Sequence, residues 1–254
     1  MILKNKHFVT FITICVLHAC RQPKPELKNI SGKQIEINQS ISASDSIEKF
    51  IAPYHHRINQ ILDSVLAYTP VTITKTEGQY NTSAGNLMAD IVLEEVNPIF
   101  MSRTGNNIDF VLLNFGGIRS IISKGNITAR SAFEVMPFEN SVFVAELDGK
   151  AVRELVAFLI TASVPHPIAG IQIVVDKNKA LEEVNIQGKP FDENKTYFVA
   201  TSDYLVTGGD RMNFFKNHIS LTNTDYLIRN TMIDYFKRVD TVHAAIDNRF
   251  IQKN

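Results

Sequence analysis

A nearly continuous apolar run at residues 109–113 constrains the fold of this chain more than any other segment. A strand that faces water on one side alternates apolar and polar residues, whereas an unbroken apolar run is typical of a strand covered on both faces. The chain must therefore cover this strand from above and from below. Its 254 residues, 44% of them hydrophobic, are enough for one good-sized core, so we expect one domain with a short appendage.

Further strands and helices are predicted around this strand by their periodicity. We expect strands at residues 141–147, 170–175, 183–186 and 197–202, and a short one at 34–37. We expect helices at residues 45–66 with a bend at Pro53, at 84–96 with an end near Pro98, at 150–160 and at 224–239. The order mixes helices with adjacent and separated strands. It predicts an α/β fold of the α+β type, with a mixed, largely antiparallel sheet flanked by helices.

The N-terminus indicates export. Lys4 and Lys6 precede a mostly apolar run at residues 8–19, which is too short to span a bilayer because a spanning helix needs about 20 residues. A basic flank and a short apolar run are typical of a secretory signal peptide, and this one ends in Leu17-His18-Ala19-Cys20. That ending resembles a bacterial lipobox, whose cysteine receives the lipid. A plain signal peptide or a short anchor is the alternative.

Three regions follow from this interpretation: a lipoprotein signal peptide at 1–19, a polar tether at 20–44 and a domain at 45–254. A lipid on Cys20 would anchor the chain at the bacterial cell envelope, on the periplasmic side, as its only membrane contact. The two cysteines are Cys15 and Cys20, so we expect no disulfide in the mature domain. Lys plus Arg and Asp plus Glu number 26 each, so the net charge gives no reason to expect a nucleic-acid partner.

Five short motifs could carry chemistry. They are Gly85-Asn86-Leu87, Asn114-Phe115-Gly116-Gly117-Ile118-Arg119, Pro137-Phe138-Glu139-Asn140, the stretch from Gly188 to Tyr197, and the stretch from Asp203 to Asp210. Gly116 and Gly117 directly follow the buried strand, where glycines let backbone N–H groups approach a ligand closely. An arginine at the end of such a loop can fork onto a phosphate or a carboxylate. Taken alone, a Gly-Gly turn after a strand is more often only a turn.

In this order the motifs resemble the C-terminal, substrate-binding domain of the 5′-nucleotidase and UDP-sugar hydrolase family. The resemblance covers roughly residues 70–216 and implies the fold of that domain. The substrate-binding residues that it implies are Asn114, Gly116, Gly117, Arg119, Phe138, Tyr204 and Asp210.

The resemblance also implies a role for each side chain. Phe138 and Tyr204 would sandwich the base, where a stacking face is worth about 1–3 kcal/mol. Asp210 would accept hydrogen bonds from the ribose hydroxyls, and Arg119, with Asn114 beside it, would meet the phosphate. The alternative roles are a core Phe138, an ordinary strand-end Tyr204, a turn-capping Asp210 and a solvated Arg119.

Two departures from the family pattern concern positive charge. The family places a further arginine shortly before its Gly-Asn-Leu motif, but residues 78–82 contain none. The family also tends to follow its Gly-Gly-Asp with glycine, whereas Arg211 follows Asp210 here. Arg211 either supplies the missing charge or crowds the site, and the sequence leaves both open.

Metal ligands are the part of the family pattern that we do not find. In the family, an N-terminal calcineurin-like domain holds two metal ions that activate water, and two such ions need about six to eight His, Asp and Asn ligands. The seven histidines show no ligand spacing, and His55 and His56, side by side on a predicted helix, point in different directions. We therefore predict no metal ligand, no catalytic residue and no cofactor in this chain.

The leading hypothesis is the nucleotide-binding half of a 5′-nucleotidase, acting in nucleotide catabolism or salvage. The divalent metals and the hydrolysis of nucleoside 5′-phosphates would belong to a separate calcineurin-like metallophosphatase chain, and the helix at residues 45–66 would take the place of the family's interdomain helix. The alternatives are a non-catalytic lipoprotein that binds a nucleotide or another ligand, and a degenerate structural domain.

Overall fold

The structure is a computed structural model that describes residues 26–38 and 40–253. The predicted signal peptide and Cys20 lie outside the described residues. The chain divides into two compact units, Met1–Phe50 and Ile51–Asn254. Among the described residues, none of the helices combines the length and the apolar character needed to cross a membrane.

Residues 26–38 contain neither a helix nor a strand, so the strand predicted at 34–37 is wrong. Ile35 and Ile37 are exposed, and alternation alone does not make a strand when no neighbour supplies hydrogen bonds. Helix α2 (Asp45–Leu62) confirms the helix predicted from residue 45, although it ends earlier than expected. It contains Pro53 and buries none of its residues. The end is early because Val65 belongs to strand β1 (Val65–Thr69), which pairs with β3 (Gly125–Thr128).

A five-stranded sheet forms the centre of the second unit. Its strands are β2 (Phe110–Leu112), β4 (Ser141–Asp148), β5 (Ile168–Ala169), β9 (Thr196–Ser202) and β10 (Ser220–Leu227). They lie in the order β10-β4-β9-β2-β5, in which the β9–β2 pair is parallel and the other pairs are antiparallel. The predicted mixed, largely antiparallel sheet is confirmed.

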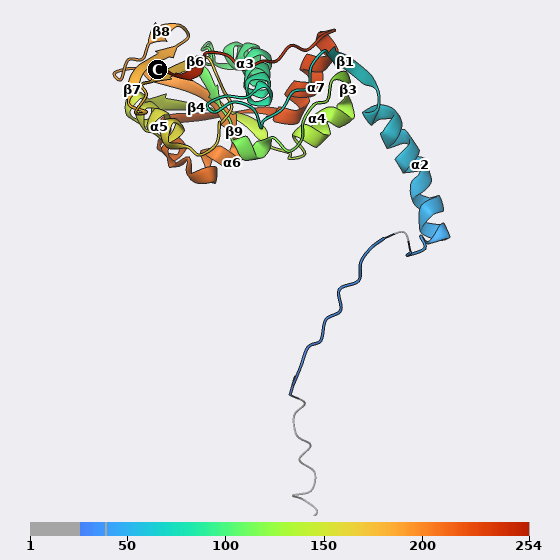
Figure 1. The fold of residues 1–254 in the computed structure, drawn as a ribbon. Coiled ribbons are helices and arrows are strands. Elements are labelled where there is room, and N and C mark those ends of the chain that lie inside the picture. The colour runs from blue at the N-terminus through green and yellow to red at the C-terminus, as the bar shows by residue number, and fades with distance from the viewer. Residues whose placement is uncertain (1–25, 39, 254) are drawn as a thin grey trace, which may run out of the picture. The chain divides into compact units, whose positions relative to one another are not determined.

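Helices cover both faces of this sheet, as the apolar strand requires. Val111 and Leu113 lie in one buried cluster with residues of α3 (Ser83–Thr104) and α7 (Ile228–Arg238). Phe110 and Leu112 lie in a second cluster, with residues of α5 (Gly149–Thr161). Figure 1 shows α3 and α5 on opposite sides of the strands. Successive side chains of β2 therefore enter different halves of the core.

Two further helix boundaries differ from prediction. Helix α3 continues through Pro98 to Thr104 because Val96 and Phe100 on either side of the proline are fully buried. Pro98 itself is exposed, and the carbonyl that loses its helical partner belongs to Glu94, which is also exposed. The helix predicted from residue 224 begins at Ile228, since residues up to Leu227 pair with β4 as part of β10.

The remaining strands form a second sheet in the order β11-β6-β7-β8. These strands are β6 (Ile171–Val175), β7 (Leu181–Ile186), β8 (Lys189–Pro190) and β11 (Phe250–Gln252). The short helices are α4 (Ala129–Val135), α6 (Asp203–Val206), η1 (Phe115–Gly117), η2 (Gly209–Arg211) and η3 (Asn213–Asn217). Three of them, η1, α6 and η2, carry residues of the predicted site.

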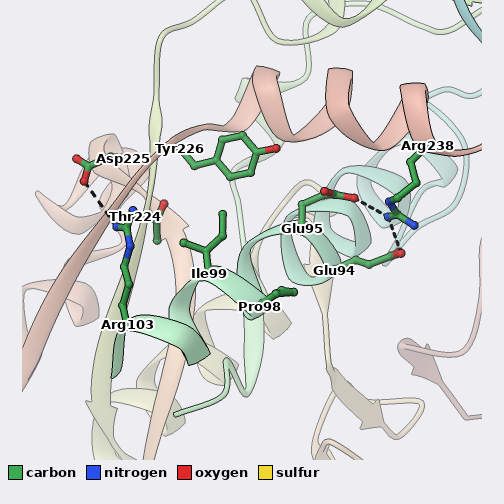
Figure 2. A pocket seen from close by; sticks show the side chains of 9 residues that line it. All are labelled: Glu94, Glu95, Pro98, Ile99, Arg103, Thr224, Asp225, Tyr226 and Arg238. Atoms are coloured by element: carbon green, nitrogen blue, oxygen red, sulfur yellow. Dashed lines mark hydrogen bonds and ion pairs between the residues drawn. The ribbon is translucent and has the colours of Figure 1, made fainter. Parts of the chain in front are cut away.

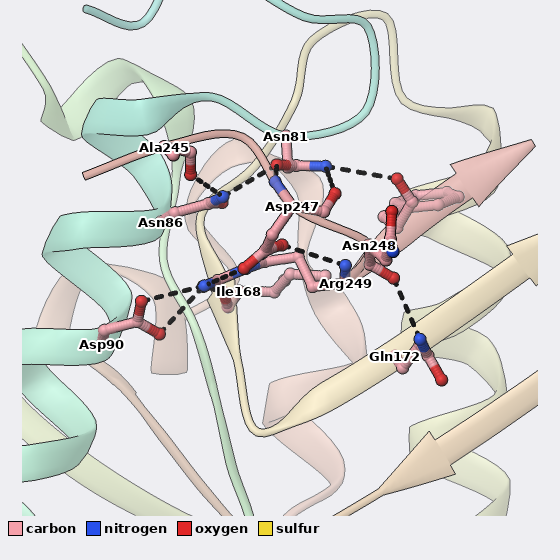
Figure 3. A network of polar contacts seen from close by, with 10 residues as sticks. Asn81, Asn86, Asp90, Ile168, Gln172, Ala245, Asp247, Asn248 and Arg249 are labelled. Carbon is pink, nitrogen blue, oxygen red and sulfur yellow. Dashed lines mark hydrogen bonds and ion pairs between the residues drawn. The ribbon is translucent and has the colours of Figure 1, made fainter. Parts of the chain in front are cut away.

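A polar network fastens the C-terminal segment to the start of α3 (Figure 3). Both terminal nitrogens of Arg249 donate to the Asp90 carboxylate at 2.9 Å, and Arg249 also bonds to Asp247. Asn86 donates to the Asn81 side chain at 2.8 Å, and Asn81 donates to the backbone of the C-terminal segment. The Asn86 of the first motif is therefore a buried structural residue.

Candidate functional site

Three of the motifs meet at one edge of the five-stranded sheet. Strands β2 and β9 are parallel neighbours, with Val111 paired to Ala200, so the loops that follow them leave from the same edge. Strand β4 runs antiparallel to β9, with Val142 paired to Ser202, so the segment that precedes β4 reaches this edge too. The topology brings together residues 114–119, 137–140 and 203–211.

Asp210 lies at the centre of the hydrogen bonds at this edge. Asn114 Nδ2 donates to Asp210 Oδ2 at 2.7 Å, and the Tyr204 hydroxyl donates to Asp210 Oδ1 at 2.9 Å. The backbone N–H of Asp210 donates back to the Tyr204 hydroxyl at 3.2 Å. A carboxylate has about four lone-pair sites, so Asp210 is held in place by two bonds and can accept more from a ligand.

Glycines permit the close approach of these loops. A Cβ on Gly209 would lie 2.6 Å from the Tyr204 ring, and one on Gly117 would lie 3.1 Å from Asn114 Oδ1. Gly208 has φ 91°, a conformation that favours glycine. Gly117 therefore leaves room for the Asn114 side chain, whereas a Cβ on Gly116 would make only ordinary contacts with Asn114 and Asp210.

Phe138 and Tyr204 present accessible rings at this edge. They are 43% and 45% exposed, so neither is a core residue. Asp203 connects the segments that carry them, because its Oδ1 accepts from Asn140 Nδ2 at 2.6 Å and from the Tyr204 backbone N–H at 2.7 Å. The two segments that carry the aromatic residues are thus joined through one carboxylate.

Arg229 of α7 holds the Phe138 segment through a hydrogen bond and an ion pair. Its side chain is buried, donates to the Phe138 carbonyl at 3.2 Å and pairs with Glu139 at 3.5 Å. The guanidinium also lies 4.2 Å from the centre of the Phe133 ring. The sequence analysis missed Arg229 because its α7 position gives no signal of a partner 91 residues away.

Arg119 projects from the end of the loop that follows β2. It is exposed, its Nη1 donates to the Gly116 carbonyl at 3.4 Å, and its guanidinium carbon lies 5.9 Å from the centre of the Phe138 ring. The described residues give it no ion-pair partner, which leaves its charge available to an anion.

Lys75 is a second cation beside Arg119, and the sequence analysis did not identify it. Its Nζ donates to the carbonyls of Phe115 and Ile118 and lies 4.3 Å from the centre of the Phe115 ring. Burial and the neighbouring Arg119 charge lower the pKa of Lys75. Lys75 therefore holds the loop that carries Arg119 and adds positive charge to the same region.

A cavity of about 490 Å³ opens next to Asp210. Gly116, Phe115, His166 and Arg211 are among its walls. His166 is 8% exposed, and its Nδ1 accepts the Phe115 backbone N–H at 3.2 Å. Burial lowers the pKa of His166, although the Asp210 charge opposes this.

A larger cavity of about 710 Å³ lies elsewhere, beside α3, β10 and α7 (Figure 2). Its charged groups pair with one another: Arg103 lies 3.6 Å from Asp225, and Arg238 lies 2.7 Å from Glu94. None of the motif residues that meet at the sheet edge lines it. Volume therefore does not identify the candidate site, whereas the convergent motif residues do.

The described part of the chain contains no group of three or more His, Cys, Asp or Glu side chains that could hold a metal ion. At the candidate site, Asp210 is bonded to Tyr204 and Asn114, and His166 accepts a backbone N–H. These residues do not fit a two-metal centre, and we derive no metal-dependent step from them.

Comparison with known proteins gives consistent results. Residues 65–217 match the domain family described as "5'-nucleotidase, C-terminal domain". Protein UshA of Yersinia enterocolitica is 26% identical over 88% of this chain and 39% of its own length. Protein UshA of Escherichia coli is 31% identical over 58% of this chain and 27% of its own length. The chain thus spans well under half the length of these relatives.

Solved structures have a similar fold. The 5′-nucleotidase precursor of Thermus thermophilus superposes with a TM-score of 0.68 at 23% identity, over 82% of this chain and 43% of that one. The NAD nucleotidase of Haemophilus influenzae gives a TM-score of 0.56 at 19% identity, over 85% and 44%. The domain match covers more than half of the chain, and the fold agrees with it. This protein belongs to the 5′-nucleotidase C-terminal domain family.

Proposed function

We propose that this chain binds a nucleoside 5′-phosphate at the edge formed by the loops after β2 and β9. The observation that carries the proposal is the Asp210 carboxylate, held at both oxygens by Tyr204 and Asn114 beside exposed aromatic rings. A carboxylate that only capped a turn would not need two side-chain donors from separate loops.

Each part of a nucleotide has a suitable partner here. The rings of Phe138 and Tyr204 offer stacking faces, each worth about 1–3 kcal/mol. Asp210 has free lone pairs for the ribose hydroxyls, and Gly116 lies beside its carboxylate. Arg119, with Lys75 beside it, offers the phosphate a positive region.

We further propose that catalysis uses a separate calcineurin-like metallophosphatase chain, which would hold the divalent metals and release nucleoside and phosphate. This rests on the family resemblance, in which substrate binding and metal chemistry belong to different domains. The same proposal places the chain at the bacterial cell envelope, exported and anchored through a lipid on Cys20. Loss of membrane association in a Cys20→Ser variant would support the anchor, and unchanged association would contradict it.

Binding of adenosine and AMP to matched variants tests the site. Phe138→Ala and Tyr204→Ala should weaken both ligands by about 1–3 kcal/mol, since both carry the same ring. Arg119→Ala should weaken AMP by about 1.5–3 kcal/mol and leave adenosine nearly unchanged, because only AMP has the charged group. Arg153→Ala, which removes an exposed arginine of α5, is the control and should change neither.

Calorimetry on the purified chain gives both affinities. Loss of adenosine affinity in Arg119→Ala equal to the loss for AMP would refute the assigned role of Arg119. To test the enzyme hypothesis, an exported calcineurin-like metallophosphatase from the same organism is added, and phosphate release from AMP is measured. Turnover that needs both chains supports the split enzyme, whereas binding without turnover favours a non-catalytic nucleotide-binding lipoprotein.

A further inference from the structure

Arg211 is an unpaired cation next to the central carboxylate of the site. Most arginines in the described residues pair with carboxylates: Arg103, Arg130, Arg153, Arg229, Arg238 and Arg249. Within residues 26–38 and 40–253, the structure gives the Arg211 side chain neither an ion pair nor a hydrogen bond. Apart from Arg57 on α2, the arginines without an ion pair in this part of the chain are Arg119 and Arg211, and both lie at the candidate site.

The backbone holds Arg211 in place at a cost in strain. Asp210 and Arg211 have φ 50° and 65°, a left-handed conformation that side chains with a Cβ rarely adopt. Such residues persist where the surrounding structure fixes them, and they concentrate at ligand sites. Here the Tyr204 hydroxyl bonds both the N–H and the carboxylate of Asp210, which fixes the residue before Arg211.

The two unpaired arginines relate to Gly116 in different ways. Arg119 donates to the Gly116 carbonyl, whereas Arg211 lines the cavity of about 490 Å³ of which Gly116 is also a wall. Ser163 lines the same cavity, and its hydroxyl can donate to an anion. The site thus has one cation on the Arg119 side and a second beside Asp210.

We propose that this site prefers nucleotides with a second phosphate on the ribose, nucleoside 3′,5′- or 2′,5′-bisphosphates, and that Arg211 binds this second phosphate. The inference rests on the proposed function, in which Asp210 takes the ribose hydroxyls and Arg119 the 5′-phosphate. With one ribose hydroxyl phosphorylated, Asp210 bonds the free one and Arg211, the next residue, forks onto the phosphate. Arginine recognises a ribose phosphate in this way in dinucleotide-binding folds.

The test compares ligands of different phosphate position on the purified full chain in detergent. Titration calorimetry at constant salt uses AMP, ADP, adenosine 3′,5′-bisphosphate and adenosine 2′,5′-bisphosphate. ADP carries its second phosphate on the 5′ side and therefore controls for charge alone. We expect at least one bisphosphate to bind about 10-fold or more tighter than AMP, the effect of a hydrogen bond to a charged group.

Arg211→Gly is the decisive variant, because glycine removes the cation and also suits φ 65°. We expect it to fold and to bind AMP and the bisphosphate with similar affinity, so that the preference for the bisphosphate over AMP is lost. Arg211→Lys, which keeps the charge, should retain part of the preference.

The outcomes separate the inference from the proposed function. Binding of AMP without preference for either bisphosphate, or a preference that survives Arg211→Gly, would overturn the inference and leave the proposed function standing. Equal weakening of ADP and the bisphosphates in Arg211→Gly would also overturn it, since Arg211 would then act only as a general charge. A wild type that binds neither adenosine nor AMP would overturn both.

Discussion

Replacing Gly209 by alanine should disrupt the site from within, because the Tyr204 side chain occupies the space where the new methyl group must go. A Cβ at position 209 would lie 2.6 Å from Tyr204 Cε1, Cζ and backbone O. Movement of the ring can relieve the first two contacts but not the contact with the backbone oxygen. We therefore expect the Tyr204 side chain to be displaced and the hydrogen bond from its hydroxyl to Asp210 to break.

The size of the effect follows from two losses. A hydrogen bond to a charged group is worth about 1.5–3 kcal/mol, and overpacking by one methyl group costs about 1–3 kcal/mol. Tyr204 is nearly half exposed and can relax into water, so we expect the free energy of unfolding to fall by about 2–4 kcal/mol rather than by the full sum. Adenosine binding should weaken by about 1–3 kcal/mol through the lost stacking face.

Gly116→Ala is the matched control. A Cβ there would lie 3.4 Å from Asn114 Nδ2 and 3.8 Å from Asp210 Oδ2, which is ordinary contact. Both substitutions lower the entropy of the unfolded chain equally, so their difference isolates the displacement of Tyr204. Urea unfolding gives the stabilities and calorimetry the adenosine affinities. If Gly209→Ala and Gly116→Ala have the same stability and the same adenosine affinity, the position of Tyr204 does not require a glycine at residue 209. The described site geometry would then be wrong.

Two further predictions concern stability. Arg249→Met should lower the free energy of unfolding by about 2–3 kcal/mol. This is less than for a fully buried ion pair, because Asp90 and Asp247 are half exposed. An effect below about 0.5 kcal/mol in urea unfolding would contradict the network of Figure 3. His166 has a lowered pKa, so the unfolded chain binds its proton first and stability should fall as the pH drops below about 6.5, by up to about 1.4 kcal/mol per pH unit. His166→Asn keeps an acceptor for the Phe115 N–H and should lose this part of the pH dependence. If the free energy of unfolding changes with pH equally in the two proteins between about pH 6.5 and 5.5, His166 is not the cause of the dependence.

The central elements could be predicted because burial leaves a direct mark on the sequence. An apolar run predicted β2. Alternating or apolar stretches predicted β4, β6, β7 and β9, since each of these strands packs against the core. The strand expected at residues 34–37 shows the limit of this signal, because pairing depends on a neighbour that alternation does not specify. Pro98 shows the limit of a local rule, because two buried side chains kept the helix intact around it.

The residues of the candidate site were named from motifs, whereas their contacts with one another were not predicted. Asn114, Tyr204 and Asp210 were each named from motifs, and the structure joins them directly by hydrogen bonds. Their meeting depends on the parallel pairing of β2 with β9, strands that lie far apart in the chain, which no local pattern encodes. Lys75 and Arg229 were missed for the same reason, since their contacts with the site loops span 40 and 91 residues.

A motif shared with a family indicates the fold as much as the site. Asn86 of the Gly-Asn-Leu motif fastens the C-terminal segment, and Tyr197 of the Gly188–Tyr197 stretch bonds the backbone of Asp192 in the turn before β9. Neither contacts the loops around Asp210 through a hydrogen bond that the described residues show. The motif order therefore supports the domain fold independently of ligand binding, and a nucleotide site has to be argued from the geometry around Asp210. That geometry also includes the Arg211 cation beside Asp210, and the bisphosphate titrations test its role.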